Sequence, residues 1–362
     1  MAASGSDEEV VVQRLRRNDP ILTLLVVFPS SRQFEHHSSP DFLRRESLSQ
    51  LISSFLRGRI AKATFVSTLV SRGVTEPCFC KRWPGGGFCE ALAGNSVLTC
   101  LAIYKCEMEE EEGRRFGRSL ALNSTLQILD INECKMGLEW GVGMGDGLAG
   151  RSALTSIAVW MTPIGKDGGR RIGEALAVNS TLTQLDLFGN RMEEGGGVML
   201  GEGLAANSTL TTLNLRVNLI EEGGGTKIGE ALAVNSTLTE LVLSYNQLRG
   251  GGEKIGEGLV ANSTLTKLEI SFNEIGEEGG VKVGEALAVN STLTSLFILD
   301  HHAGRNGELR IGEGLAVNSS LTRLILGGVD QNWKDAFLER NRHRSLSLFH
   351  LLQPRLAEWT DN

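Results

Sequence analysis

The sequence predicts an α/β solenoid in which a short strand and a helix alternate in stacked units. Three observations predict it. A segment beginning Asn-Ser-Thr-Leu-Thr recurs at steps of 28 residues, with one step of 27. Each copy then contains a Leu-x-Leu alternation, which is typical of a strand, and later an apolar i, i+3, i+4 spacing, which is typical of a helix. One such unit cannot bury both apolar faces alone, so the copies must stack. The copies start at Asn95, Asn123, Arg151, Asn179, Asn207, Asn235, Asn262, Asn290 and Asn318.

The composition of the 362 residues fits this prediction and excludes other classes. The chain has 44 glycines and 7 prolines, and 41 of the glycines lie between Gly85 and Gly328. Low proline excludes collagen, and a hydrophobic fraction of 41% excludes a disordered glycine-rich linker. A net charge of −7 gives no strong attraction to nucleic acid or anionic lipid. No apolar run has the length of a membrane span, so we expect neither nucleic-acid nor membrane binding.

The strand half of each copy is the best-defined element. Leu182-x-x-Leu185-x-Leu187-x-x-Asn190 recurs in the following copies, and its alternation turns one face of a short strand inward. The polar residue that closes the pattern can turn the chain, with its side chain bonding unpaired backbone groups. Another apolar residue follows thirteen positions after each start, at Met108, Met136, Ile164, Met192, Ile220, Leu248 and Ile275.

The apolar spacing in segments such as Ile172–Ala177 and Ile228–Ala233 predicts a helix in the second half of each copy. We expect each helix to end at the next Asn-Ser-Thr, with Asn in the left-handed conformation. Glycine triplets such as Gly223–Gly225 are expected in the turn that enters the helix, where positive φ is easy for glycine. The glycine inside the helix, Gly229 in one copy, predicts close packing of neighbouring helices.

The repeat resembles the leucine-rich repeat, and specifically its ribonuclease-inhibitor-like subtype. In the first two copies Cys106 and Cys134 take the position of the closing Asn, as in that subtype, which makes both of them buried structural residues. The resemblance implies a horseshoe with a parallel sheet on the concave side and helices on the convex side.

Three segments are predicted along the chain. Residues 1–84 form divergent N-terminal repeats and a cap, 85–330 form nine repeats, and 331–362 form a helical C-terminal cap. Leu22-x-x-Leu25-x-Val27 is interpreted as a divergent first copy, and a helix is expected around Phe42–Leu56. Cys78–Cys80 is expected in a loop. His301 replaces Asn at the closing position, so an altered turn is expected there.

The cysteines and sequons bear on the compartment. Six cysteines without paired zinc spacing favour reduced thiols in a cytoplasmic protein. The apolar run Ile21–Phe28 resembles a short signal-peptide core, but the acidic residues before it argue against secretion. Seven N-x-Ser/Thr sequons are interpreted as copies of one turn, with glycosylation in a secreted chain as the alternative. They start at Asn123, Asn179, Asn207, Asn235, Asn262, Asn290 and Asn318.

No catalytic, cofactor or metal site is predicted. Gly145–Gly150 has the spacing of a dinucleotide motif but falls in a repeat helix, and Gly223–Lys227 lacks the spacing of a phosphate loop. No histidine pair has metal-ligand spacing. Glu109–Glu112 is expected on a solvated loop. Cation–carboxylate pairs at i, i+3, such as Lys227 and Glu230, are expected to keep the helix face soluble.

Function is sought in the strand residues that differ between copies. One column that should face the concave side reads Asp130, Ala158, Asp186, Asn214, Val242, Glu269, Phe297 and Ile325. Neighbouring columns add aromatic residues and an arginine, which are favoured at binding hot spots. The alternative is that Phe188 and Phe272 only pack along the sheet. The predicted protein-binding residues are Trp160, Asp186, Phe188, Arg216, Tyr245, Glu269, Phe272 and Phe297.

These residues predict a non-catalytic protein-interaction module with a protein partner and no small-molecule substrate. Two alternatives come from the resemblance, because Ran GTPase-activating proteins and NOD-like receptors have similar repeats. The chain ends Ala357-Glu358-Trp359-Thr360-Asp361-Asn362, without the strongly acidic tail of the former, and it has no Walker-type loop of the latter.

Overall fold

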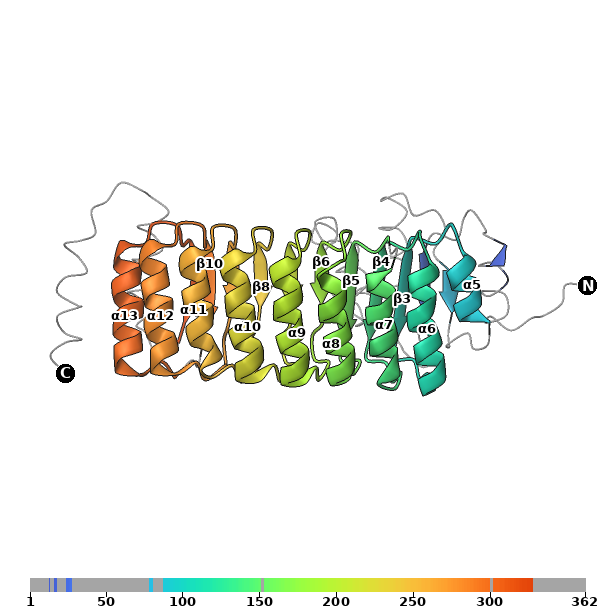
Figure 1. Ribbon diagram of the computed structural model, residues 1–362, viewed down its shortest axis with the longest axis horizontal. Helices are drawn as coiled ribbons and strands as arrows, with labels where there is room; N and C mark the ends of the chain where they lie inside the picture. Colours follow the sequence, from blue (N-terminus) through green and yellow to red (C-terminus); the bar gives the residue numbers. More distant parts are fainter. Residues whose placement is uncertain are drawn as a thin grey trace, which may run out of the picture. The chain divides into compact units, whose positions relative to one another are not determined.

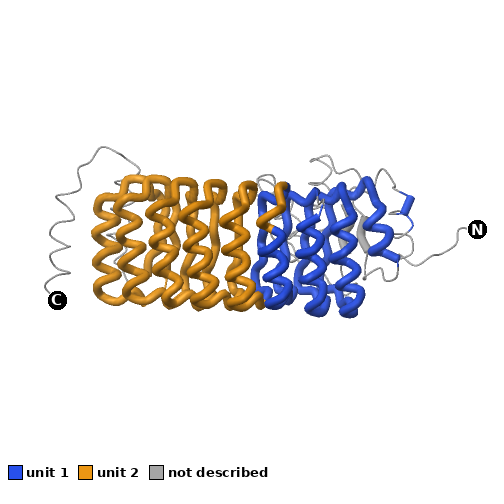
Figure 2. The backbone as a smooth tube through the Cα atoms, in the orientation of Figure 1, with its two compact units in different colours: residues 1–175, 181–190 blue, residues 176–180, 191–362 orange. Residues whose placement is uncertain are grey.

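The computed structural model describes residues 13, 16–17, 24–27, 78–80, 87–150, 153–299 and 302–327, with only the backbone at 24–27 and 78–80. The expected helix around Phe42–Leu56, the turn at His301 and the cap at 331–362 lie outside these residues. The chain divides into two compact units (Figure 2). Unit 1 is Met1–Ala175 with Thr181–Asn190, and unit 2 is Leu176–Ser180 with Arg191–Asn362.

Unit 1 alternates strands and helices, with the helices on one face of a parallel sheet (Figure 1). The repeat strands pair in register, so that Leu101, Leu129, Ile157 and Leu185 are aligned across the sheet. Its elements are β1 Leu24–Val27, β2 Cys78–Cys80, α5 Phe88–Gly94, β3 Cys100–Tyr104, α6 Glu110–Leu122, β4 Ile128–Asn132, α7 Glu139–Ala149, β5 Ser156–Trp160, α8 Gly165–Leu176 and β6 Gln184–Asp186.

The first two strands do not follow chain order. Strand β1 lies between β3 and β2, and Leu25 is aligned with Leu101, as its interpretation as the fourth residue of a first copy requires. The expectation of a loop at Cys78–Cys80 is wrong. This segment is strand β2, because the outer edge of β1 supplies backbone hydrogen-bond partners for it.

Unit 2 repeats the same alternation (Figure 1). Its strands are also parallel and in register, with Leu213, Leu241, Leu268, Leu296 and Leu324 aligned. Its elements are α9 Glu193–Ala206, β7 Thr212–Asn214, α10 Glu221–Val234, β8 Glu240–Val242, α11 Gly251–Ala261, β9 Lys267–Glu269, α12 Gly276–Val289, β10 Ser295–Ile298, α13 Gly304–Val317 and β11 Arg323–Leu326.

The core of each unit lies between the sheet and its helices. In the copy that contains β8, Leu238, Leu241, Leu243 and Leu248 are all 0% exposed, and the helix supplies buried Ile255. The other described copies bury the same positions, including every apolar residue predicted thirteen positions after the copy start. Burial of these side chains is the main stabilising term of the fold.

The closing residues of neighbouring copies form a ladder of hydrogen bonds, which we call the turn ladder. Each side chain accepts the backbone N–H of the closing residue in the preceding copy. In unit 1 the Thr162 hydroxyl accepts from Cys134 at 3.0 Å, and in unit 2 the Asn246 Oδ1 accepts from Asn218 at 2.8 Å. The sulfur of Cys134 takes the same role toward Cys106 at 3.4 Å. Both cysteines are buried, as predicted.

A second ladder, the cap ladder, corrects the expected helix ends. The Asn residues after the helices are extended, with Asn235 at φ −73 and ψ 129, and not left-handed. Their side chains cap the turn instead. The Asn235 Oδ1 accepts the N–H groups of Thr237 and Leu238, and its Nδ2 donates to the carbonyls of Leu204 and Asn207 at the end of helix α9. A left-handed backbone at this point would move the Asn235 side-chain amide away from the groups with which it forms these hydrogen bonds.

The glycine triplets were also expected in the wrong place. Gly223–Gly225 lie inside α10, and the left-handed residues before the helix are mostly not glycine, with φ of 58° at Leu219 and 57° at Glu221. The triplets pack helices closely. A Cβ on Gly224 would lie 3.0 Å from the Cα of Gly197 and 2.3 Å from the Ile220 side chain. Close packing at Gly229 is confirmed, because its Cβ would lie 2.3 Å from the Lys254 carbonyl carbon.

The single 27-residue copy is accommodated at the start of its helix. Strand β8 belongs to this copy, and its helix α11 has 11 residues where α10 has 14. The N–H groups of Gly251, Gly252 and Glu253 bond to carbonyls three residues earlier. This tighter 3₁₀ turn takes up the missing residue, so the strand register is kept.

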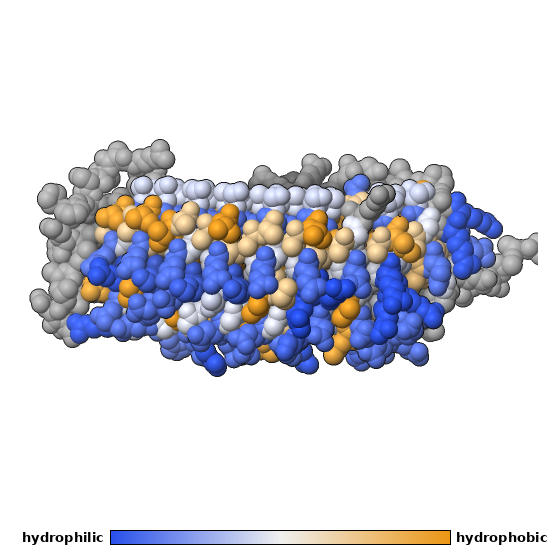
Figure 3. Space-filling model, in the orientation of Figure 1, coloured by the Kyte–Doolittle hydropathy of each residue, from blue (hydrophilic) through white to orange (hydrophobic). Residues whose placement is uncertain are grey.

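The helix face is mostly hydrophilic, with bands of apolar side chains between the charged ones (Figure 3). The predicted i, i+3 ion pairs are present, for example between Lys227 and Glu230 at 2.8 Å and between Arg171 and Glu174 at 2.7 Å. The acidic run is not a loop as expected. Glu110–Glu112 form the first turn of α6, where carboxylates are stabilised by the positive end of the helix dipole.

Candidate functional site

The residue just before each turn-ladder residue has left-handed backbone. This position holds Lys105, Glu133, Met161 and Gly189 in unit 1 and Val217, Tyr245 and Phe272 in unit 2, with φ between 50° and 73°. Bulky residues rarely adopt this conformation. Because it recurs in all of these copies, it belongs to the turn itself. Its effect is to place a variable side chain beside the carboxyl end of each strand.

In unit 2 three of the predicted residues form one stack at these strand ends. The rings of Tyr245 and Phe272 are stacked, with centroids 4.5 Å apart and planes inclined by 16°. The guanidinium of Arg216 lies over the other side, 4.9 Å from the Tyr245 centroid. We call these residues the Arg216 stack. Arg216 and Tyr245 are exposed and Phe272 is half-buried.

Two exposed apolar residues follow Arg216 in the chain. Val217 is 39% exposed and Leu219 is 40% exposed, close to the 41% of Tyr245. Both come from the same copy as Arg216, in the turn that follows β7. Arg216 and Tyr245 are residue types enriched at interface hot spots, and Val217 and Leu219 add exposed apolar surface in the same turn.

A second group, the Phe297 cluster, lies on the outward side of β8 to β11. The Phe297 ring has the Lys267 ammonium 6.0 Å and the Arg323 guanidinium 5.6 Å from its centroid. Lys267 also pairs with Glu240 at 2.5 Å and with Glu269 at 3.0 Å. Partial burial acts to lower the pKa of Lys267, but its hydrogen bonds to the two carboxylates outweigh this and raise the pKa.

Unit 1 contributes a separate pair. The Trp160 and Phe188 rings meet edge to face, with centroids 6.3 Å apart and planes inclined by 80°. Asp186, the remaining predicted residue, accepts the Phe188 N–H through its carboxylate at 3.1 Å. Met161 lies next to Trp160 in the chain and is 52% exposed. The structure therefore groups the eight predicted residues into three clusters, one in unit 1 and two in unit 2.

The column that was expected to be exposed is partly buried. Asp130 is 0% exposed, Ala158 is 7% and Val242 is 8%. The Asp130 carboxylate accepts a hydrogen bond from the Asn132 side chain, so it faces a protein group and not solvent. Cys100, in the next column, is also buried, and burial followed by the charge of Asp130 raises the pKa of its thiol well above the usual value. The outward side of β3 and β4 is therefore not an open surface.

Sequence reasoning missed the apolar neighbours Val217 and Leu219. Val217 occupies the turn position of Tyr245 and Phe272, but only the aromatic residues at this position were singled out. Their left-handed backbone, with φ of 60° and 58°, is what turns them outward. Knowledge of that turn would have been needed to find them.

Comparisons with known proteins identify the repeat. The family model described as leucine-rich repeat matches residues 178–201, 234–252 and 261–284. The repeats are leucine-rich repeats. A search of curated proteins found no match. Among solved structures, these repeats are similar to leiomodin-1 actin-binding site 2, with 23% identity, a TM-score of 0.35, and coverage of 45% of this chain and 96% of that one.

In the ranges that the structure describes, no helix combines the length and apolarity needed to cross a membrane. Within the same ranges, no group of three or more His, Cys, Asp or Glu residues is placed to hold a metal ion.

Proposed function

We propose that this chain is a non-catalytic protein-binding module and that the surface of unit 2 formed by the Arg216 stack and the Phe297 cluster contacts the partner. The observation that carries the proposal is the Arg216 stack. Arginine and tyrosine are the residue types most often found at hot spots. Stacking holds these side chains in place before binding, which lowers the entropy lost on association.

The shape of the surface also favours a protein partner. The Arg216 stack and the Phe297 cluster lie along consecutive strands of unit 2, which are about 4.8 Å apart. Together they extend across five strands, β7 to β11. A small molecule is usually held in a closed cleft that buries most of it, whereas an extended row of side chains matches another protein.

We assign the array to the ribonuclease-inhibitor-like subtype and expect a cytoplasmic location. The cysteine steps of the turn ladder in unit 1 and the period of 28 residues support the subtype. The Ran-type and NOD-like alternatives stay predictions, because no feature of the described residues adds to them.

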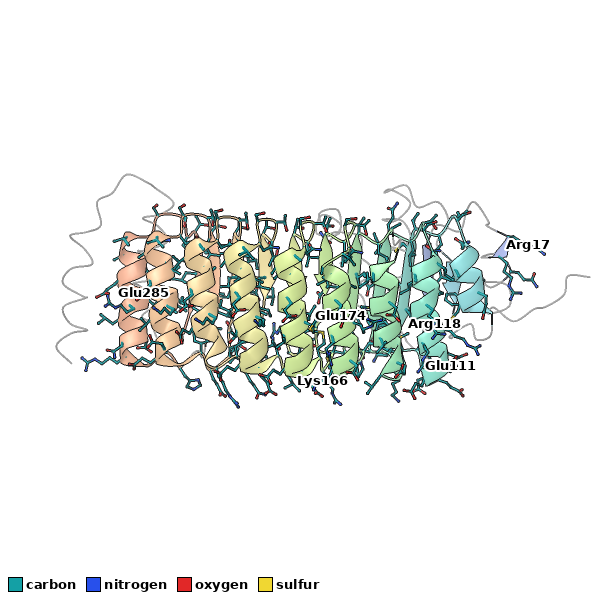
Figure 4. All side chains as sticks on the ribbon, viewed as in Figure 1. Arg17, Glu111, Arg118, Lys166, Glu174 and Glu285 are labelled. Carbon is teal, nitrogen blue, oxygen red and sulfur yellow. The ribbon has the colours of Figure 1, made fainter. Side chains whose placement is uncertain are left out.

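The proposal is tested by affinity capture from a lysate of the source organism, followed by mass spectrometry. One variant carries Arg216→Ala, Tyr245→Ala and Phe272→Ala in unit 2, and a second carries Trp160→Ala and Phe188→Ala in unit 1. A control carries Arg118→Ala and Lys166→Ala on the helix side of unit 1 (Figure 4). Thermal unfolding of each variant verifies that it is folded.

We expect the unit 2 variant to lose partners that the wild type and the control both retain. An unchanged partner list for the unit 2 variant contradicts the proposed surface. If only the unit 1 variant loses partners, the binding surface is the Trp160–Phe188 pair and not the surface of unit 2.

A further inference from the structure

Two arginines on unit 2 stack on aromatic rings. Arg216 lies over Tyr245, 4.9 Å from the ring centroid, and Arg323 lies over Phe297, 5.6 Å from the ring centroid. Neither guanidinium has a carboxylate within 4.0 Å among the described residues. An arginine that stacks on an aromatic ring keeps its N–H edge available, and this edge matches a carboxylate with two parallel hydrogen bonds.

The two carboxylates nearest in the sheet share one lysine. Glu240 and Glu269 both pair with Lys267, between the two arginines in strand order. The five charged side chains of this surface are therefore three cations and two carboxylates, in a chain whose net charge is −7. The local excess of positive charge is complementary to an acidic partner.

We propose that unit 2 binds an extended acidic segment of a partner protein, with one carboxylate on Arg216 and a second on Arg323. This rests on the proposed function and names the chemistry of the partner. Apolar side chains between the two acidic residues would contact Tyr245, Val217 and Phe297. A carboxylate fits better than a phosphate, because phosphate recognition generally uses a cluster of arginines and here the two are separate.

The fold sets the spacing of the two acidic residues. Arg216 follows β7 and Arg323 opens β11, four strand steps away. At about 4.8 Å per step across the sheet and about 3.3 Å per residue for an offset of about four residues along the strand, the two are roughly 23 Å apart. An extended chain covers about 3.3 Å per residue, so the acidic residues should be separated by about six or seven positions.

The test uses labelled synthetic peptides and the full chain, with binding followed by fluorescence anisotropy. Each peptide has one fixed Asp, a second Asp placed from about three to about nine positions later, and Leu and Phe between them. Matched peptides carry Asn in place of either Asp. A single-stranded RNA of similar length tests the nucleic-acid alternative.

We expect the tightest binding at a separation of about six or seven, and about tenfold weaker binding when either Asp becomes Asn. Arg216→Gln and Arg323→Gln should each weaken binding by a similar factor, and each should make replacement of its own Asp nearly neutral. Arg118→Gln in unit 1, an exposed arginine with no place in this surface, should leave binding unchanged.

Four results would overturn the inference: no peptide binds, affinity is independent of the separation, the two arginine variants bind like Arg118→Gln, or RNA binds more tightly than every peptide. The capture experiment is a separate readout. If the unit 2 alanine variant loses partners while no acidic peptide binds, the surface is correct and the acidic ligand is wrong.

Discussion

At the scale of single residues, asparagine side chains connect one copy to the next. The turn ladder and the cap ladder use the same property, because an amide both donates and accepts hydrogen bonds. Asn246, for example, accepts from Asn218 and donates to the carbonyls of Leu215 and Leu243. Each such residue satisfies backbone groups that the short strands leave unpaired. The recurrence of Asn therefore follows from stacking, and Cys134 and Thr162 supply the acceptor at the same step in unit 1.

Asn246→Ala tests the turn ladder. The side chain is 0% exposed, and its removal takes away the acceptor of the Asn218 N–H and one of the two amide donors to the Leu215 carbonyl, which keeps the bond from Asn218 Nδ2. We expect a loss of about 3 kcal/mol in the free energy of unfolding, measured with urea. Thr239→Ala is the control, because its exposed hydroxyl makes one bond to the Thr211 carbonyl and should cost less than about 1 kcal/mol. Equal losses would contradict a special role for the ladder.

The cap ladder bears on whether the seven N-x-Ser/Thr sequons can be glycosylated. The seven sequon asparagines are at most 8% exposed, and in the described copies their Nδ2 atoms donate to carbonyls at the end of an earlier helix, as Asn290 does to Leu259 and Asn262. The same nitrogen would carry a glycan. We expect the folded protein, produced through a eukaryotic secretory pathway, to carry no N-glycan at these sites, as checked by intact mass before and after glycosidase treatment. A glycan on a protein with native unfolding behaviour would contradict this.

The Cys89 thiol gives a dependence of stability on pH. Burial, followed by the charges of Glu90 and Glu112, raises its pKa from 9.0 to about 12. The folded state therefore holds this proton more tightly than the unfolded state, so its stabilising contribution is complete below pH 9 and is lost as pH rises toward 12. Urea unfolding at about pH 7.5 and about pH 10 should show a larger loss for the wild type than for Cys89→Ala. Identical losses would rule out this thiol as a source.

At the scale of elements, glycine sets the distance between helices. A Cβ on Gly229 would lie 2.3 Å from the Lys254 carbonyl carbon, whereas Gly94 in α5 has no atom within 4 Å of its added Cβ. We expect Gly229→Ala to cost at least about 2 kcal/mol and Gly229→Leu more, because backbone cannot yield as a side chain can. Gly94→Ala should be neutral or slightly stabilising. Thermal unfolding compares the three, and a neutral Gly229→Leu would contradict the close approach.

Comparison of elements also shows what the sequence could predict. Strands, helices and core positions followed from periodicity, because burial acts on every copy alike. The glycine triplets and the caps were misplaced, because the same residue serves a turn, a cap or a helix contact, and only the neighbouring copy decides between these roles. At the candidate site, the residue types of Arg216 and Tyr245 were recognisable. Their stacking was not, because it depends on the left-handed turn and on the alignment of adjacent copies.

At the scale of the whole molecule, each copy makes the same contacts with the copy before it. Asn235 donates to Leu204 and Asn207, and Asn262 donates in the same way to Leu232 and Asn235. Removal of residues 235–261 would bring Asn262 to the place that Asn235 now holds. Stability in such arrays is approximately a sum of copies and nearest-neighbour contacts, so one complete copy is dispensable.

We therefore expect the deletion of 235–261 to fold, with a cooperative urea transition at lower denaturant and unchanged secondary structure per residue by circular dichroism. Deletion of 235–248 alone, about half a copy, should abolish cooperative unfolding, because it joins a helix to a helix and breaks the strand register. If both deletions unfold alike, the copies are not interchangeable units.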